Sequence, residues 1–310
     1  MIAFIFPGQG SQKVGMGGEL AEASAVAREV FGEVDEALKQ NLFKLMSDGP
    51  ESELTMTANA QPAIMANALA VARILEDGGV KLSEKGEAVA GHSLGEYSAL
   101  TSVGAFSLTD TAKLLRTRGI AMQDAVPLGT GSMCALLGAD LEKAQALADA
   151  AEGNEICEVA NDNDPGQVVL SGHMGAIDRA VELAKEHGIK RAIKLPVSAP
   201  FHCSLMEPAA RQMRVALENT PVQSFRLPVY SNVTAAPVSE ASEEQQLLVE
   251  QITGRVRWRE SVAAMHEAGI THFVELGGKV LGPMVRKIAP DATVTSVVGM
   301  DDIEAFAKDV

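Results

Sequence analysis

The 310-residue sequence predicts an α/β fold in which a large domain with a mostly parallel sheet carries an inserted ferredoxin-like domain. Short apolar strands alternate with helical segments at both ends of the chain, and this alternation is typical of a parallel sheet covered on both faces. In the middle, the order reads strand, helix, strand, strand, helix, strand, which is the ferredoxin-like plan. We therefore assign residues 1–126 and 197–310 to the large domain and residues 127–196 to the small one.

The first part of the large domain opens with an apolar strand over residues 1–6, which ends at a glycine-rich loop over 7–12. The clearest helical pattern runs from Thr57 to Glu76. A short apolar strand over 87–90 leads into a second glycine-rich turn over 91–95, and two further helical segments follow.

The small domain is predicted to contain four strands and two helices. We expect strands over 132–137, 155–160, 167–171 and 190–195, and helices over 140–151 and 176–187. Asp140 is placed to cap the first helix, because aspartate accepts hydrogen bonds from the free backbone N–H groups at a helix start. The segment Asn161 to Gly166 is predicted to be a turn, because Asn, Asp, Pro and Gly dominate turns.

The second part of the large domain resumes the alternation after Pro196. We expect helices over 205–219 and 242–252, strands at 229–230 and 271–276, and a last helix from Gly277-Gly278 to about Ile288. These elements would complete the sheet that the first part begins.

Composition and charge exclude several classes of partner. A formal net charge of −15 argues against nucleic acid or anionic lipid as the main partner, because both require clustered Lys and Arg. Three scattered cysteines, Cys134, Cys157 and Cys203, fit a reducing compartment rather than a disulfide framework. The N-terminus lacks the basic flank of a signal peptide, and the most apolar long stretch, 62–75, is too short to span a membrane. We therefore expect a cytoplasmic protein.

Gly91-His92-Ser93-Leu94-Gly95 matches the G-x-S-x-G pattern of a nucleophilic serine. A serine between a strand and a helix lies on a sharp turn that lifts its hydroxyl above the sheet, where the free N–H groups of the helix face developing charge. The alternative is a glycine-rich turn with an uninvolved serine, since a five-residue match occurs by chance. The strand before and the helix after favour the nucleophile.

A serine nucleophile needs a base, and the sequence has six histidines. Four are set aside because they adjoin the serine, lie in the small domain or are expected on a helix surface: His92, His173, His187 and His266. His202 lies where the chain re-enters the large domain, a place where loops line clefts. His272 begins a strand, so the spacing favours His202 and leaves His272 open.

Common cofactor and metal motifs are absent from the sequence. It contains no phosphate loop, and Gly8-Gln9-Gly10 lacks the third glycine of a dinucleotide fingerprint. Neither H-E-x-x-H nor paired cysteines occur. We therefore expect no metal and no cofactor.

Several motifs in the same order resemble one family, the malonyl-CoA:acyl carrier protein transacylases of fatty acid synthesis and the related acyltransferase domains of polyketide synthases. The resemblance covers nearly the whole chain and rests on these segments: Phe6 to Gln12, Gly91 to Tyr97, Arg118-Gly119 with Met122-Gln123, Asn161 with Pro165 to Val169, Ser198 to His202, and Val249 to Gln251. It implies a hydrolase-like large domain beside the ferredoxin-like one.

The resemblance implies that Ser93 is the nucleophile and His202 the base. The backbone carbonyl of Gln251 would orient the histidine in place of the carboxylate of a hydrolase triad. The backbone N–H groups of Gln9 and Leu94 would hold the oxyanion.

By the same resemblance, Arg118 would bind the malonyl carboxylate, because a buried carboxylate needs a partner and a guanidinium binds both of its oxygens. Arg118 borders the apolar stripe of its helix, and the alternative is a rim arginine beside the core. Phe201 would crowd an α-methyl group and so favour malonyl over branched groups. His92, Asn161 and Gln61 complete the expected pocket.

The implied reaction is a ping-pong transfer from malonyl-CoA to the thiol of an acyl carrier protein. Such carriers are acidic, so we expect docking at a local basic patch on a monomeric enzyme. The candidates are Lys190, Arg191, Lys194, Lys279, Arg286 and Lys287. The alternative for each is scattered solubilising charge.

Two other functions fit part of the pattern. A serine hydrolase shares the serine turn but predicts a late histidine as the base, which would be His272. A non-catalytic module that binds carrier proteins would not need Ser93.

Overall fold

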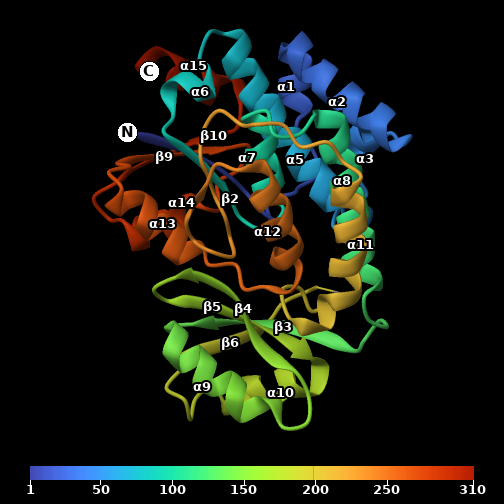
Figure 1. Cartoon of the computed structure of the whole chain (residues 1–310), viewed down its shortest axis with the longest axis vertical. Helices are drawn as coiled ribbons and strands as arrows, with labels where there is room; N and C mark the ends of the chain where they lie inside the picture. The colour runs from blue at the N-terminus through green and yellow to red at the C-terminus, as the bar shows by residue number, and fades with distance from the viewer. Residues whose placement is uncertain (198) are drawn as a thin grey trace.

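The computed structural model describes residues 1–197 and 199–310 and contains two separate sheets (Figure 1). The larger sheet has the order β10-β9-β1-β2-β7-β8, and its neighbours are parallel except for β7 and β8. Its strands are β1 (Ile2–Phe6), β2 (Ala88–Gly91), β7 (Val229–Tyr230), β8 (Pro237–Val238), β9 (His272–Leu276) and β10 (Thr293–Val297). This mixed, mostly parallel sheet confirms the predicted α/β class.

Helices cover both faces of the large sheet. They are α1 (Gly18–Ala23), α2 (Ala25–Leu38), α3 (Leu42–Asp48), α4 (Glu51–Leu54), α5 (Thr57–Asp77), α6 (Leu82–Lys85), α7 (Gly95–Ser102), α8 (Leu108–Asp124), α11 (Glu207–Glu218), α12 (Ala241–Thr253), α13 (Trp258–Glu267), α14 (Gly282–Ile288) and α15 (Met300–Asp309). Successive side chains of a strand point to opposite faces. Accordingly Phe4 and Phe6 of β1 join the core that includes α5, whereas Ala3 and Ile5 join a second core with Trp258.

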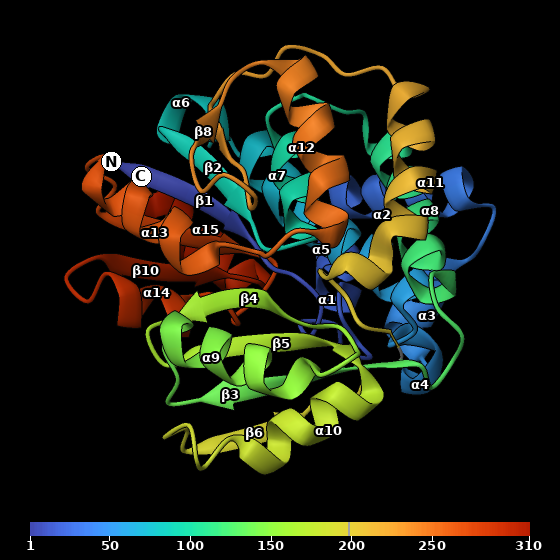
Figure 2. The ribbon, with the colours of Figure 1, turned by 60° about the horizontal axis from the view of Figure 1, so that its bottom comes forward.

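The smaller sheet is antiparallel, in the order β4-β5-β3-β6. Its elements are β3 (Gly131–Leu137), α9 (Leu141–Glu152), β4 (Cys157–Asp164), β5 (Gln167–His173), α10 (Met174–Leu183) and β6 (Arg191–Lys194). Asp140 caps α9 as predicted, because its side chain accepts from the Lys143 N–H at 2.9 Å. In Figure 2, β4 lies nearest the large sheet and β6 farthest from it. The ferredoxin-like order is therefore confirmed, while the domain limits at 127 and 196 stay a prediction.

The two faces of the small sheet join different cores. Cys134 and Leu136 of β3 pack in the core that includes α9 and α10, which Figure 1 shows on the side away from the large sheet. Met133 and Ala135 of the same strand belong to the main core of the molecule. The small sheet therefore presents an apolar face to the large domain.

The predicted six-residue turn at Asn161 to Gly166 is wrong, because β4 continues to Asp164 and only Pro165-Gly166 turns. The large domain satisfies the polar side chains that otherwise favour a turn. Asp162 pairs with Arg259 at 2.7 Å, and Asp164 pairs with Lys287 at 2.9 Å. Two backbone hydrogen bonds also join this part of β4 to Val256. Tertiary partners therefore override the local turn preference.

Other predicted elements have the right type, with ends shifted by a few residues, and several observed elements had no predicted range. The elements without a predicted range are α1 to α4, α6, β8, β10, α13 and α15. No helix in the described part of the chain is long and apolar enough to cross a membrane.

Candidate active site

Ser93 lies on a tight turn between β2 and α7. Its φ is +54°, a left-handed value that residues with side chains rarely adopt. A Cβ added to Gly91 would lie 1.9 Å from the Gly95 carbonyl, and one added to Gly95 would lie 2.3 Å from the Phe6 oxygen. Both glycines are therefore required by close backbone packing, and the strained turn raises the serine hydroxyl above the sheet.

His202 is hydrogen-bonded to this serine. Its Nε2 lies 2.8 Å from Ser93 Oγ, and its Nδ1 lies 2.8 Å from the backbone oxygen of Gln251. Because a carbonyl only accepts, Nδ1 carries the proton and Nε2 accepts from the serine. A Ser-His dyad is therefore present, and a backbone carbonyl orients its histidine.

The surroundings of His202 keep the imidazole neutral. Burial lowers the pKa of His202 to about 3, and the positive charge of Arg118 acts in the same direction. A neutral imidazole is the form that can take a proton from a serine.

Arg118, on α8, is a buried guanidinium beside the dyad. Its Nη1 donates to Gln61 Oε1 at 2.8 Å, and its Nη2 donates to Gln251 Oε1 at 2.8 Å and to Ser93 Oγ at 3.1 Å. Its guanidinium carbon lies 5.6 Å from the centre of the Tyr97 ring. Among the described residues, Nε has no hydrogen-bond partner and no carboxylate pairs with the group. A buried cation with no carboxylate in salt-bridge contact favours an anionic ligand.

Gln9 and Leu94 both line the cavity over the dyad. In the described ranges, neither backbone N–H donates to a protein acceptor. The loop after β1 packs tightly on the serine turn, since a Cβ on Gly8 would lie 2.7 Å from the His92 oxygen. Two free N–H groups next to a nucleophile are what an oxyanion requires.

A second layer of buried polar side chains holds the serine turn from below. Asn232 Oδ1 accepts from Ser93 N, and its Nδ2 donates to the Gly91 oxygen, both at 2.7 Å. Gln251 Nε2 donates to the Ser93 oxygen at 3.0 Å and to Glu96 Oε2 at 2.7 Å. Sequence reasoning missed the roles of Asn232 and Glu96. Glu96 had one signal, a charge in an apolar helix directly after the motif, whereas Asn232 had none.

The cavity over Ser93 has a volume of about 380 Å³ and brings together nine of the ten predicted site residues. They are Gln9, Gln61, His92, Ser93, Leu94, Arg118, Asn161, Phe201 and His202. The tenth, Gln251, lies fully buried behind the cavity. Ser198, from the predicted motif before His202, lies outside the described residues.

His92 points toward the small sheet. Its Nε2 lies 2.8 Å from Asn163 Oδ1 on β4, and its ring lies 5.7 Å from that of Trp258. The histidine next to the nucleophile therefore joins the serine turn to the small domain.

The alternative base, His272, lies at the wrong end of the sheet. It pairs with Ile2 at the start of β1, whereas Gly91 pairs with Phe6 at the end of the same strand. Because the strands are parallel, His272 and Ser93 lie at opposite edges. The His272 Nε2 instead lies 2.8 Å from Thr295 Oγ1.

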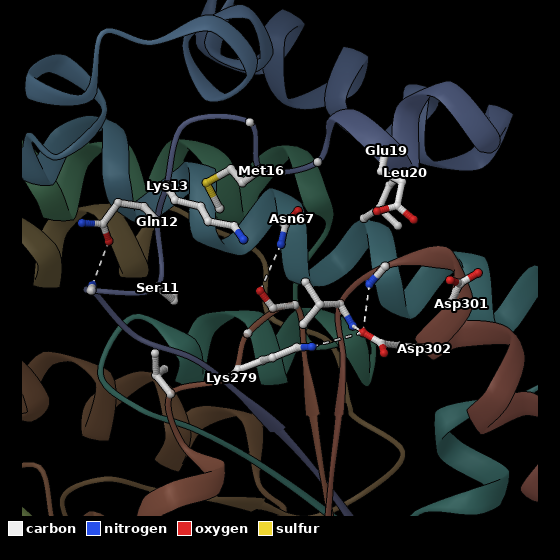
Figure 3. Close-up of a pocket in the computed structure, with 18 residues that line it drawn as sticks. Ser11, Gln12, Lys13, Met16, Glu19, Leu20, Asn67, Lys279, Asp301 and Asp302 are labelled. Atoms are coloured by element: carbon white, nitrogen blue, oxygen red, sulfur yellow. Dashed lines mark hydrogen bonds and ion pairs between the residues drawn. The ribbon is translucent and has the colours of Figure 1, made fainter.

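A larger cavity, of about 630 Å³, adjoins the first one at the loop after β1, and Figure 3 shows the residues that line it. It shares Gly10, Gln12 and Val280 with the first cavity but contains neither Ser93 nor His202. Two of its charged side chains form an ion pair: Lys279 lies 3.8 Å from Asp302, as the dashed line in Figure 3 marks. In the described part of the chain, no group of three or more His, Cys, Asp or Glu is arranged to hold a metal. The first cavity is therefore the candidate active site.

The proposed basic residues do not form one patch. Arg191 and Lys194 lie on β6, one edge of the small sheet, and Lys190 precedes them. Arg286 and Lys287 lie on α14, which packs against β4 at the opposite edge. Lys194 and Lys287 are also paired, with Asp178 at 2.6 Å and with Asp164 at 2.9 Å.

Comparison with known families gives a match over most of the chain. A family model described as an acyl transferase domain matches residues 3–282. A malonyl CoA-acyl carrier protein transacylase of Bacillus subtilis (strain 168) is 43% identical over 306 residues, which cover 98% of this chain and 95% of that protein. The protein of the same name from Escherichia coli (strain K12) is 40% identical over 297 residues, or 95% of each chain.

Solved structures agree with these relatives. An acyl-carrier-protein S-malonyltransferase from Bartonella henselae superposes with a TM-score of 0.97 at 47% identity, covering 99% of this chain and 98% of that one. A malonyl-transacylase solved in complex with its type II PKS acyl-carrier protein gives a TM-score of 0.96 at 36% identity, covering 100% and 99%.

Proposed function

The chain belongs to the acyl transferase family, and we propose that it is a malonyl-CoA:acyl carrier protein S-malonyltransferase that supplies fatty acid or polyketide elongation. The observation that carries the proposal is Arg118, a buried guanidinium that has no carboxylate partner among the described residues and donates to Ser93 Oγ at 3.1 Å. A malonyl group on Ser93 would bring its free carboxylate within reach of that guanidinium. An acetyl group would leave the buried cation unpaired.

In the first half-reaction, Ser93 Oγ attacks the thioester carbonyl of malonyl-CoA while His202 Nε2 takes the hydroxyl proton. The negative charge on the carbonyl oxygen is held by the N–H groups of Gln9 and Leu94. The carbon–sulfur bond then breaks, the coenzyme A sulfur receives the proton from His202, and a malonyl-serine ester remains.

In the second half-reaction, the phosphopantetheine thiol of the carrier protein attacks the ester. His202 Nε2 takes the thiol proton and returns it to Ser93 Oγ as the ester bond breaks. One thioester replaces another, so the reaction is near balance and runs in both directions. His202 is suited to both steps because the Gln251 carbonyl fixes its tautomer at 2.8 Å.

Selectivity against branched groups is assigned to Phe201, which lines the cavity next to His202. A ring at that place leaves little room for an α-methyl substituent. One methyl group is worth about 1–3 kcal/mol of discrimination, so the preference for malonyl over methylmalonyl is partial. His92, Asn161 and Gln61 shape the rest of the pocket in this proposal.

Replacing the guanidinium tests the proposal. In Arg118→Ala, serine malonylation from malonyl-CoA should fall by about 10²-fold or more, because the malonyl carboxylate is then buried without a partner. Acetylation from acetyl-CoA should be retained or rise. Intact-mass analysis of the acyl-enzyme measures both, with Ser93→Ala as the unlabelled control. An equal loss of both acyl groups would make Arg118 a purely structural residue.

We also propose a cytoplasmic location, a monomeric enzyme and a small domain that spans residues 127–196. The location is supported by the three cysteines, which are all buried and unpaired. Light scattering of the purified chain tests the monomer, and fractionation of cells tests the location.

A further inference from the structure

Two carboxyl groups are buried together beneath the dyad. Glu96 on α7 and Glu244 on α12 both have 0% of their surface exposed to solvent. Three of their four carboxyl oxygens, Glu96 Oε1 and both oxygens of Glu244, are buried without a hydrogen-bond donor among the described residues, and the two carboxyl groups interact with each other. Neither group takes part in the acyl transfer described above, so their burial needs another explanation.

The pair cannot consist of two carboxylates. Glu96 Oε2 accepts from Gln251 Nε2 at 2.7 Å and from Asn232 N at 3.0 Å, whereas both oxygens of Glu244 lack a donor among the described residues. A carboxylate only accepts hydrogen bonds, so one of the two groups must carry a proton to join them. Burial raises the pKa of both carboxyl groups, and repulsion from Glu96 raises that of Glu244 further.

The pair joins the two helices that support the dyad. Glu96 follows Ser93 by three residues, and Glu244 precedes Gln251 by seven residues, which is about two helical turns and therefore the same face of α12. Gln251 also contacts the base and the substrate-binding arginine. Its carbonyl accepts from His202 at 2.8 Å, its Nε2 donates to Glu96, and its Oε1 accepts from Arg118 at 2.8 Å.

We propose that Glu96 and Glu244 form a proton-sharing positioning pair, which fixes α12 against α7 and so holds the Gln251 carbonyl on His202. This inference rests on the proposed acyl transfer, because its readout is acylation of Ser93. The charged and titratable groups that face the pair are Arg118 of α8, Tyr97 of α7 and Glu243 of α12.

Substitutions at position 244 give a first test of the pair. Glu244→Gln keeps the shape and offers an amide N–H to Glu96, so the rate of Ser93 malonylation should stay within about threefold of wild type at pH 7. Glu244→Ala removes the donor and should lower that rate by about 10²-fold with little change in KM, because a small displacement of a catalytic group has that effect. The matched control is Glu240→Gln, an exposed carboxylate directly before the same helix, which should behave as wild type.

The pH profile gives a second test that does not depend on the folding of the alanine variant. In wild type, acylation should decline at alkaline pH when the shared proton is lost and two buried carboxylates repel each other. Glu244→Gln cannot form that second charge, so its alkaline limb should lie at a pH higher by about one unit or more. Glu240→Gln should keep the wild-type limb.

The inference is overturned if Glu244→Gln is as slow as Glu244→Ala, or if its alkaline limb coincides with that of wild type. Failure of the proposed function looks different, because wild type itself would then gain no malonyl group. Rapid-quench intact-mass analysis of the full chain with malonyl-CoA, from neutral to alkaline pH, reads out both.

Discussion

The two walls of the active-site cavity are built from different kinds of side chain. The wall from the large domain carries Ser93, His202 and Arg118. Hydrogen bonds of 2.8 and 3.1 Å connect Ser93 to His202 and to Arg118. The wall from the small domain consists of apolar and amide side chains and has no ionisable group in its described lining: Met133, Ala135, Asn161, Asn163, Gln167, Val169, Leu195 and Pro196. One wall therefore carries the chemistry, and the other sets the shape of the space.

The sharpest test of this division is removal of the base from the large-domain wall. His202→Ala should lower the rate of Ser93 acylation by about 10³-fold, because general base catalysis contributes that order of magnitude. His272→Ala is the matched control and should stay near wild type, since that ring lies at the other edge of the sheet. Single-turnover acylation measures both variants. If His272→Ala were the slower one, the assignment of the base to His202 would fail.

The pH dependence of acylation tests whether the charge of Arg118 influences the pKa of His202 within the large-domain wall. Protonated His202 cannot accept from Ser93, so a pKa of about 3 keeps the base active down to acidic pH. The acid limb of the wild-type profile should therefore lie well below about pH 6.5, the value for an unperturbed histidine. Arg118→Ala removes a cation that lowers the pKa of His202, and its acid limb should move to higher pH.

This shift is measured with acetyl-CoA, because the variant is expected to lose malonyl transfer. The control is Arg116→Ala. Arg116 is a nearby cation on the same helix, but it donates to Asn59 and not to the dyad. Coincident acid limbs in wild type and Arg118→Ala would show that the guanidinium does not influence the base.

The smallest effect on the rate is expected from removing the ion pair between Asp162 and Arg259, which joins the small domain to the large one. Asp162→Ala removes the partner of Arg259 and should lower the free energy of unfolding by about 1–3 kcal/mol, because a buried acceptor and its ion pair are lost. The turnover number should stay within about threefold, while KM for malonyl-CoA rises as the wall loosens. Thermal melting and steady-state kinetics measure the two effects.

The control for that variant is Asp178→Ala, whose partner Lys194 lies on the surface of the same domain. An exposed pair contributes about 0–1 kcal/mol, so this variant should melt close to wild type. A large fall in turnover in Asp162→Ala would mean that the small domain also carries part of the chemistry.

The sequence predicts the large-domain wall well, because its residues are tied to short motifs with a fixed backbone geometry. Ser93 needs glycines on either side, so the turn is visible in the sequence before the fold is known. The ferredoxin-like order could also be predicted, because the spacing of apolar residues distinguishes its strands from its helices. Predicting the base needed more than spacing, which left His272 open until the strand register placed it at the far edge.

What the sequence could not predict are partners far apart in the chain. Asn161 to Asp164 has the composition of a turn, yet Arg259 and Lys287 bind both of its carboxylates, and the segment continues β4. Asn232 and Glu244 carry no local signal, because the groups that they hold come from other elements. The separation of β6 from α14 likewise appears only once the strand order is known, and it divides the proposed basic patch in two.

The backbone bonds between β4 and Val256 couple the width of the cavity to the aim of the base. Val256 accepts from Asp162 N at 2.9 Å and donates to the Ala160 oxygen at 2.8 Å, only five residues after Gln251 anchors His202. Any rotation of the small domain that opened this edge would pull on the same short segment that aims the imidazole. Widening the cavity for a bulky acyl chain would therefore also turn His202 away from Ser93. An acyl group that is too large would then meet a less reactive serine.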